Sequence, residues 1–120
     1  MDSQTVIHNW LIDFLKTRFL KDYGEIGINP EGEDIEEFGG CYPDLILKNQ
    51  GMIVAIVEVE TESTINDERG AYWKKLSQLG TKLILMVPEN RKAKVTGLLW
   101  QHGIMQNVSV GSYSIKISMP

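Results

Sequence analysis

The chain has 120 residues, 42 % hydrophobic and 23 % charged, which is typical of one folded domain and excludes a disordered chain. A single cysteine, Cys41, excludes an internal disulfide and a cysteine-based zinc site, and fits a reducing cytoplasmic setting. The net charge of −4 does not by itself suggest a nucleic-acid binder. No signal peptide begins the chain and its longest apolar run, residues 52–57, is too short to cross a bilayer. We therefore expect a soluble, cytoplasmic protein with no membrane contact, folded as one domain over residues 1–120.

Hydrophobic periodicity and turn residues predict a mixed α/β fold with helices around one sheet. In chain order the predicted elements are a helix at 4–23, a strand at 25–28, an acidic loop at 31–37, strands at 44–48 and 52–60, a helix from Asn66 or Asp67 to Leu79, a strand at 82–87, a helix at 89–101, and strands at 104–110 and 113–118. The last two strands are expected to join at Gly111-Ser112.

Several aromatic and histidine side chains are expected to serve packing. The apolar positions of the first helix are Val6, Ile7, Trp10, Leu11, Phe14, Leu15 and Phe19. Trp10, Trp73 and Trp100 are expected in the core. His8 and His102 lack a cysteine or histidine at ligand spacing, so helix packing or surface exposure explains them.

Three carboxylates are expected to meet where two neighbouring strands begin and end. If residues 44–48 and 52–60 pair as a hairpin across residues 48–51, Asp44 opens one strand where Glu58 closes the other. Glu58 and Glu60 share a strand face, roughly 7 Å apart. Such carboxylates are costly to bury unless they are paired or bind a cation, and magnesium prefers oxygen ligands. The pattern indicates a metal-dependent phosphodiesterase, although exposed strand-end charges are a simpler alternative. Glu36 or Glu37 of the acidic loop is a further candidate ligand.

With Pro43-Asp44 opening one strand and Glu58-Val59-Glu60 ending the next, the chain resembles the PD-(D/E)xK nuclease superfamily over roughly residues 4–103. The resemblance implies a restriction-endonuclease-like fold, a mixed central β-sheet flanked by helices in the order α-β-β-β-α-β-α-β-β. It also implies that Asp44 and Glu58 bind Mg²⁺ or Mn²⁺, with the Val59 carbonyl completing the ligand set.

The chain departs from that family at Glu60, where lysine is expected to position or activate the attacking water. Glu60 could act as a base or as another metal ligand. Alternatively the lysine has moved to the following helix, where Lys74 and Lys75 are candidates with Gln78 beside Lys74. A third alternative is that the fold remains but cleavage is lost. A solvated helix face also explains both lysines.

Charge is distributed unevenly along the chain. Residues 1–68 hold 15 acids and four bases, a net of −11, whereas residues 69–120 hold one acid and eight bases, a net of +7. The basic part could bind phosphates while metal ions reverse the sign of the acidic cluster, or the charges could merely improve solubility. The candidate nucleic-acid-binding residues are Arg69, Lys74, Lys75, Gln78, Arg91, Lys92 and Lys94.

The leading hypothesis is therefore a metal-dependent DNA nuclease with catalytic residues Asp44, Glu58, Glu60, Lys74 and Lys75. We expect low intrinsic sequence specificity and a homodimer, because so short a chain has no separate target-recognition domain. One alternative is a catalytically inactive nucleic-acid-binding or assembly module on the same fold. Another is an unrelated α/β interaction protein without metal binding.

Overall fold

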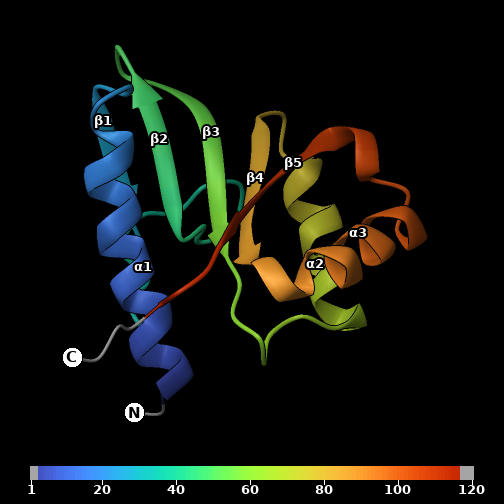
Figure 1. Ribbon diagram of the computed structural model, residues 1–120. Coiled ribbons are helices and arrows are strands. Elements are labelled where there is room, and N and C mark those ends of the chain that lie inside the picture. The colour runs from blue at the N-terminus through green and yellow to red at the C-terminus, as the bar shows by residue number, and fades with distance from the viewer. Residues whose placement is uncertain (1–2, 117–120) are drawn as a thin grey trace, which may run out of the picture.

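A computed structural model describes residues 3–116 (Figure 1). Over this part of the chain three α-helices and five strands follow one another in nearly the predicted order. Their bounds are α1 Ser3–Phe19, β1 Glu25–Ile28, β2 Leu45–Asn49, β3 Met52–Val59, α2 Asp67–Ser77, β4 Lys82–Pro88, α3 Lys92–Gln101 and β5 Val108–Tyr113. Short 3₁₀ turns occupy Glu89–Arg91 and Met105–Asn107. The chain is a compact α/β domain with a radius of gyration of 14.1 Å.

The five strands form one mixed sheet in the order β1-β2-β3-β4-β5. β1, β2 and β3 are antiparallel, whereas β3, β4 and β5 are parallel. The predicted hairpin is confirmed, since Gln50 and Gly51 join β2 to β3 with φ angles of 53° and 78°. Two consecutive positive φ angles give a type I′ turn, which matches the twist of paired strands. α2 and α3 make the long crossovers that parallel strands require.

Helices cover both faces of the sheet, with α1 on one side and α2 and α3 on the other (Figure 1). Alternate residues of a strand point to opposite faces, so Leu45 and Leu47 pack with α1 whereas Ile46 packs with α2 and α3. Strand β3 divides its side chains in the same way and is buried from Ala55 onward. This sandwich confirms that β3 is a central strand covered on both sides.

The first helix is shorter and less deeply packed than predicted. It ends at Phe19 instead of residue 23, and its buried residues are His8, Leu11, Ile12 and Leu15. Val6, Trp10 and Phe14 were expected in the core but are 53–54 % exposed, with Trp10 stacked on Phe14 at 5.5 Å. A single helix lying on a sheet buries one narrow stripe, and these three residues lie outside that stripe.

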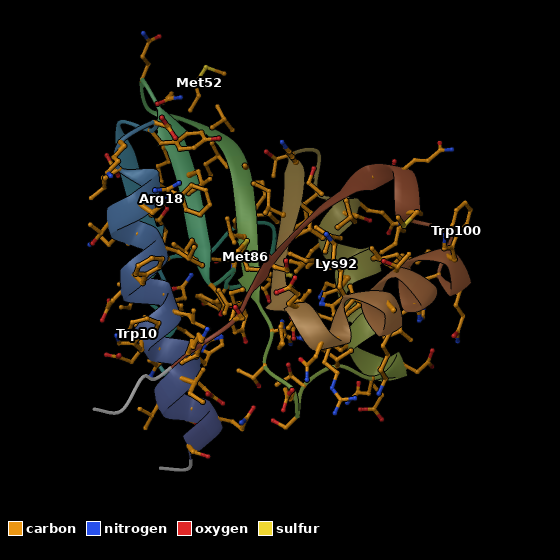
Figure 2. All side chains as sticks on the ribbon, in the orientation of Figure 1. Trp10, Arg18, Met52, Met86, Lys92 and Trp100 are labelled. Carbon is orange, nitrogen blue, oxygen red and sulfur yellow. The ribbon has the colours of Figure 1, made fainter. Side chains whose placement is uncertain are left out.

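The tryptophans also differ from one another. Trp73 is fully buried between α2 and the sheet, as predicted, whereas Trp100 at the end of α3 is 67 % exposed. Figure 2 shows Trp10 and Trp100 on opposite sides of the molecule. The prediction that all three pack the core is therefore wrong for Trp10 and Trp100.

The two strands predicted near the C-terminus are a single strand, β5, which pairs with β4 from Val108 to Tyr113. Gly111 does not make a turn. A Cβ atom at this position would lie 2.6 Å from the sulfur of Met86, so the glycine allows β5 to pass close to that side chain. Of the predicted strand at 113–118, only Tyr113 is in a strand, as the last residue of β5. Residues 114–116 are not in a strand, and residues 117 and 118 lie outside the described part of the chain. Among residues 3–116, no helix combines the length and apolar character needed to cross a membrane.

Candidate active site at the end of strand β3

Asp44 and Glu58 interlock where β2 begins and β3 ends. Leu45 pairs with Val57 in the hairpin, which brings the preceding Asp44 opposite the following Glu58. The Asp44 backbone N–H donates to Glu58 Oε2 at 2.7 Å, and the Val59 N–H donates to Asp44 Oδ2 at 2.7 Å. Each carboxylate is thus held by the backbone of the opposite strand. The proximity expected for these two residues is present.

His8 reaches the same carboxylate from helix α1. Its Nε2 lies 3.1 Å from Asp44 Oδ2, and its Nδ1 lies 3.2 Å from Asn9 Oδ1. Because a carboxylate only accepts, Nε2 carries the proton of this bond. Burial lowers the pKa of His8, but the hydrogen bond to Asp44 and the charge of Asp44 outweigh burial, so the pKa is raised above 6.5.

Sequence reasoning missed this role of His8. It treated the residue as packing or exposed, whereas the structure places it in the buried stripe of α1 beside a carboxylate. A signal was present, because His8 precedes Leu11 and Ile12 by three and four residues and so shares their helix face. A polar residue on a buried helix face requires a partner, and Asp44 is that partner.

Arg69, in the first turns of α2, connects the remaining carboxylates. Its Nε donates to Glu60 Oε1 at 2.9 Å and Oε2 at 3.0 Å, and its Nη2 donates to Glu58 Oε1 at 3.1 Å. The guanidinium also lies 4.7 Å from the centre of the Tyr72 ring. Burial lowers the pKa of Arg69, but the charges of Glu60 and Glu58 raise it overall. This residue was predicted only as a nucleic-acid contact, and the structure instead places it among the carboxylates.

Glu60 is fully buried, and three side chains donate hydrogen bonds to its carboxylate. Besides Arg69, Thr64 Oγ1 donates to Oε1 at 2.8 Å and Trp73 Nε1 donates to Oε2 at 3.0 Å. These bonds compensate the cost of removing a carboxylate from water. Glu60 therefore anchors the start of α2 to the end of β3 and positions Arg69.

The electrostatics of Glu58 differ from those of Glu60. Burial raises the pKa of Glu58 well above its usual range, and the nearby Asp44 charge raises it further, while Arg69 acts in the opposite direction. Burial and the charge of Glu58 also raise the pKa of Tyr72. The environment around Glu58 is thus negative and dry, a condition that a bound cation relieves.

These side chains line a groove of about 310 Å³ at the end of the sheet. Its described walls include His8, Tyr42, Asp44, Glu58, Arg69 and Tyr72. α1 and α2 reach the groove from opposite faces of the sheet, so His8 and Arg69 meet Asp44 and Glu58 there, while Glu31 and Asp34 of the acidic loop also line the groove. The two tyrosines add apolar and aromatic surface beside the charges.

The loop before Asp44 is fixed by the buried Asn29. The side-chain oxygen of Asn29 accepts from the Ile35 and Glu36 N–H groups at 2.8 and 2.7 Å, and its amide donates to the Glu36 and Pro43 carbonyls at 2.8 and 2.7 Å. This cluster holds Pro43 in place and so orients Asp44. Glu36 itself pairs with Lys48 at 2.6 Å and Glu37 accepts from the Gly40 N–H, so both side chains are engaged outside the groove.

Most of the predicted basic residues lie away from the carboxylates. Lys74 and Lys75 are exposed and are not among the described residues lining the groove, and the same holds for Gln78, Arg91, Lys92 and Lys94. Lys74 is five residues after Arg69, about 7.5 Å farther along the helix axis. Arg69 is closer to the sheet end because α2 starts there and runs away from it.

The structure offers a limited set of metal ligands. Asp44 and Glu58 are adjacent, Val59 lines the groove with them, and Glu60 is engaged with Arg69, Thr64 and Trp73. Within residues 3–116, no three histidine, cysteine or acidic side chains converge in a way that could hold a metal ion. Two carboxylates with water and substrate phosphate nevertheless suit magnesium, which keeps several waters in most protein sites.

Comparison with protein-family models, with curated proteins and with solved structures gave no match to this chain.

Proposed function

We propose that this protein is a metal-dependent phosphodiesterase acting on DNA, built on a restriction-endonuclease-like fold. The observation that carries the proposal is the interlocked pair Asp44–Glu58 beside the Arg69 guanidinium, all lining one groove. The antiparallel hairpin β2–β3, followed by α2 and the parallel strand β4, supports the proposed fold.

In this proposal Asp44 and Glu58, with the Val59 carbonyl, hold Mg²⁺ or Mn²⁺. A divalent ion there lowers the pKa of its water and offsets charge on the phosphoryl oxygens. His8 keeps Asp44 in position through the bond from Nε2. The raised pKa of Glu58 fits a residue whose charge is balanced by a ligand that binds there.

Arg69 takes the role of the lysine expected at position 60. Its guanidinium lies beside Glu58, where a cation can stabilise negative charge that develops on the phosphate. The proposal thus replaces Lys74 and Lys75 as the catalytic cations and assigns Glu60 to holding Arg69. Arginine stays charged at any ordinary pH, so it stabilises charge and does not act as a base.

The test is cleavage of plasmid, single-stranded and four-way-junction DNA with magnesium or manganese. Asp44→Asn should reduce the rate by about 10³-fold, because a metal ion supplies several kcal/mol of charge stabilisation. Arg69→Gln should cost about 10²-fold or more. Asp22→Asn and Arg18→Gln, at exposed positions of the α1 region, are matched controls that should cut normally. A wild type that cuts none of the substrates with either metal would refute the proposal.

A second candidate function is a catalytically inactive nucleic-acid-binding module on the same fold. It is favoured by the engagement of Glu58 and Glu60 with Arg69, which neutralises charge that would otherwise attract a metal ion. This alternative predicts DNA binding with a strong salt dependence, no cleavage, and binding that survives Asp44→Asn. Low sequence specificity and a homodimer remain predictions under both functions.

A further inference from the structure

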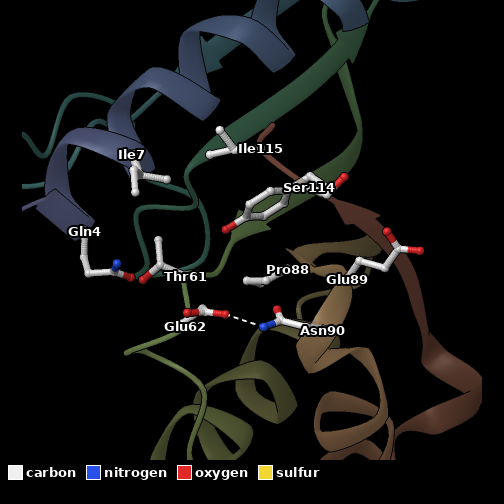
Figure 3. Close-up of a pocket in the computed structure, with 10 residues that line it drawn as sticks. Gln4, Ile7, Thr61, Glu62, Pro88, Glu89, Asn90, Ser114 and Ile115 are labelled. Atoms are coloured by element: carbon white, nitrogen blue, oxygen red, sulfur yellow. Dashed lines mark hydrogen bonds between the residues drawn. The ribbon is translucent and has the colours of Figure 1, made fainter. Parts of the chain in front are cut away.

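A second cavity of about 620 Å³ lies beside the carboxylate groove (Figure 3). Its walls come from the start of α1, the loop after β3, the end of β4 and the segment at the end of β5. Figure 3 shows Ile7 and Ile115 across the pocket from Glu62 and Asn90. None of these four residues lines the carboxylate groove.

The pocket and the groove are neighbours that share two walls. Gln4 and Thr61 line both cavities. Tyr113 of the pocket donates from its hydroxyl to the Glu60 carbonyl at 2.6 Å, directly behind the carboxylates. A DNA strand bound with one phosphate at Asp44 and Glu58 would therefore place a neighbouring nucleotide at the pocket.

The pocket walls suit a flat apolar ring. Ile7, Pro88 and Ile115 present aliphatic surface, and the Tyr113 ring is fixed because its hydroxyl is bonded. Aromatic side chains stack nucleobases in proteins that bind single strands, and this contact is tolerant of sequence. The volume of about 620 Å³ also exceeds what one base requires.

The polar edge of the pocket accepts hydrogen bonds. Asn90 Nδ2 donates to Glu62 Oε1 at 2.6 Å, and because a carboxylate only accepts, this bond fixes the orientation of the amide. The Asn90 oxygen and the second Glu62 oxygen are then left as acceptors, with the Glu89 carboxylate nearby. Two carboxylates repel a phosphate, so the uncharged part of a nucleotide is the part that fits.

We propose that this pocket binds a nucleobase carrying an exocyclic amino group, next to the phosphate that is cleaved, an inference that rests on the proposed nuclease function. Adenine, guanine and cytosine can each donate from an amino group to Glu62 and Asn90. Thymine presents a single N–H between two carbonyl oxygens, and these oxygens would face the carboxylate. The pocket thus distinguishes thymine from the other three bases.

The first test is titration of the metal-free protein with each of the four uncharged deoxynucleosides, with binding monitored by the NMR chemical shifts of the backbone amides. Deoxyadenosine, deoxyguanosine and deoxycytidine should shift the amides of Ile7, Thr61, Asn90 and Ser114, and thymidine should bind about fivefold more weakly. Glu62→Gln can present an amide donor in place of the carboxylate oxygen, so it should remove most of this preference. Glu68→Gln, an exposed glutamate outside the pocket, is the matched control and should keep it.

Cleavage of single strands, measured separately, distinguishes failure of the pocket from failure of the nuclease. An amino-bearing base beside the cut should speed cleavage over thymine in the wild type and not in Glu62→Gln. If no deoxynucleoside shifts the pocket amides, or thymidine binds as tightly as the others, the pocket proposal is overturned even when the protein cuts DNA. Deoxynucleoside binding without cleavage of any substrate would overturn the role as a nuclease subsite.

Discussion

Arg69 and Glu60 form an ion pair in which one guanidinium nitrogen, Nε, lies within 3.0 Å of both carboxylate oxygens. Under the proposed nuclease function a lysine is expected at position 60, whereas this chain has a glutamate there and a cation nine residues later on α2. Arg69 thus brings a positive charge from α2 to Glu58 as well as to Glu60.

The ion pair predicts that a lysine at position 60 would destabilise the protein. Glu60→Lys would put a second cation against Arg69 in a fully buried position and remove one of the two carboxylates that pair with Arg69. Breaking a buried pair in this way costs about 3–5 kcal/mol, a large share of the stability of a small domain. Urea denaturation followed by circular dichroism should show this loss, with Glu68→Lys as an exposed control. A stable Glu60→Lys protein would contradict the anchoring role of Glu60.

The pair His8–Asp44 predicts a pH-dependent contribution to stability. The folded pKa of His8 is raised, so protonated His8 stabilises the fold below pH 6.5 and this contribution is lost as the pH rises through the folded pKa. His8→Gln should therefore lower the melting temperature more at pH 5.5 than at pH 8.5. An equal loss at both pH values would mean that the charge of His8 is irrelevant to the pair.

Glu58 should destabilise the fold when it is ionised. Its folded pKa is raised above 4.5, so the ionised carboxylate opposes folding, and the wild type loses stability as the pH rises from 4.5 through the folded pKa. Glu58→Gln removes this penalty, and thermal melts should show a gain over the wild type that is larger at pH 8 than at pH 5. A variant less stable than the wild type at pH 8 would show that the pair with Arg69 outweighs burial.

Metal binding can be measured without cleavage. At a free magnesium concentration ten times the dissociation constant, binding to the folded state adds about 1.4 kcal/mol, or about 5 °C in melting temperature. Asp44→Asn should abolish this shift and a chelator should reverse it, whereas Asp22→Asn should retain it. An Asp44→Asn protein that is stabilised as much as the wild type would place the ion elsewhere.

Two pairs of the predicted basic residues lie at different ends of their helices. Arg91 ends the 3₁₀ turn after β4 and Lys92 begins α3, at the sheet end where β3 and β4 finish. Lys74 and Lys75 instead lie in the last turn of α2. Neutralising Arg91 and Lys92 to glutamine should lower the salt slope of duplex binding by up to about 1.8. The matched Lys74 and Lys75 double variant should have a smaller effect. Equal slopes for the two double variants would contradict this division.

The hairpin and its carboxylates could be predicted because their determinants are local. The turn residues fix the pairing of β2 with β3, and strand alternation then brings Asp44 opposite Glu58. The pattern of acidic and apolar residues within positions 44–60 is therefore enough to predict that Asp44 and Glu58 lie close together. The same holds for the buried strand β3 and for most helix positions.

The partners of those carboxylates could not be predicted in the same way. His8 is 36 residues from Asp44, and its contact depends on how α1 rotates on the sheet. The resemblance implies a lysine, which favours Lys74 and Lys75 in the last turn of α2, whereas Arg69 in the first turn of that helix contacts the carboxylates. The sequence around Gly111 indicates a turn, because the close packing of Met86 against this glycine depends on tertiary structure.

Because the three tryptophans are unequally buried, the fluorescence of Trp73 can be separated from that of the other two and used to monitor the site. Trp73 donates its indole N–H to Glu60 in a dry interior, whereas Trp10 and Trp100 are more than half exposed. Aqueous quenchers should therefore suppress the emission of the two exposed indoles and spare the buried one. With Trp10 and Trp100 replaced by phenylalanine, the remaining emission would report changes around the carboxylates as an intrinsic optical probe.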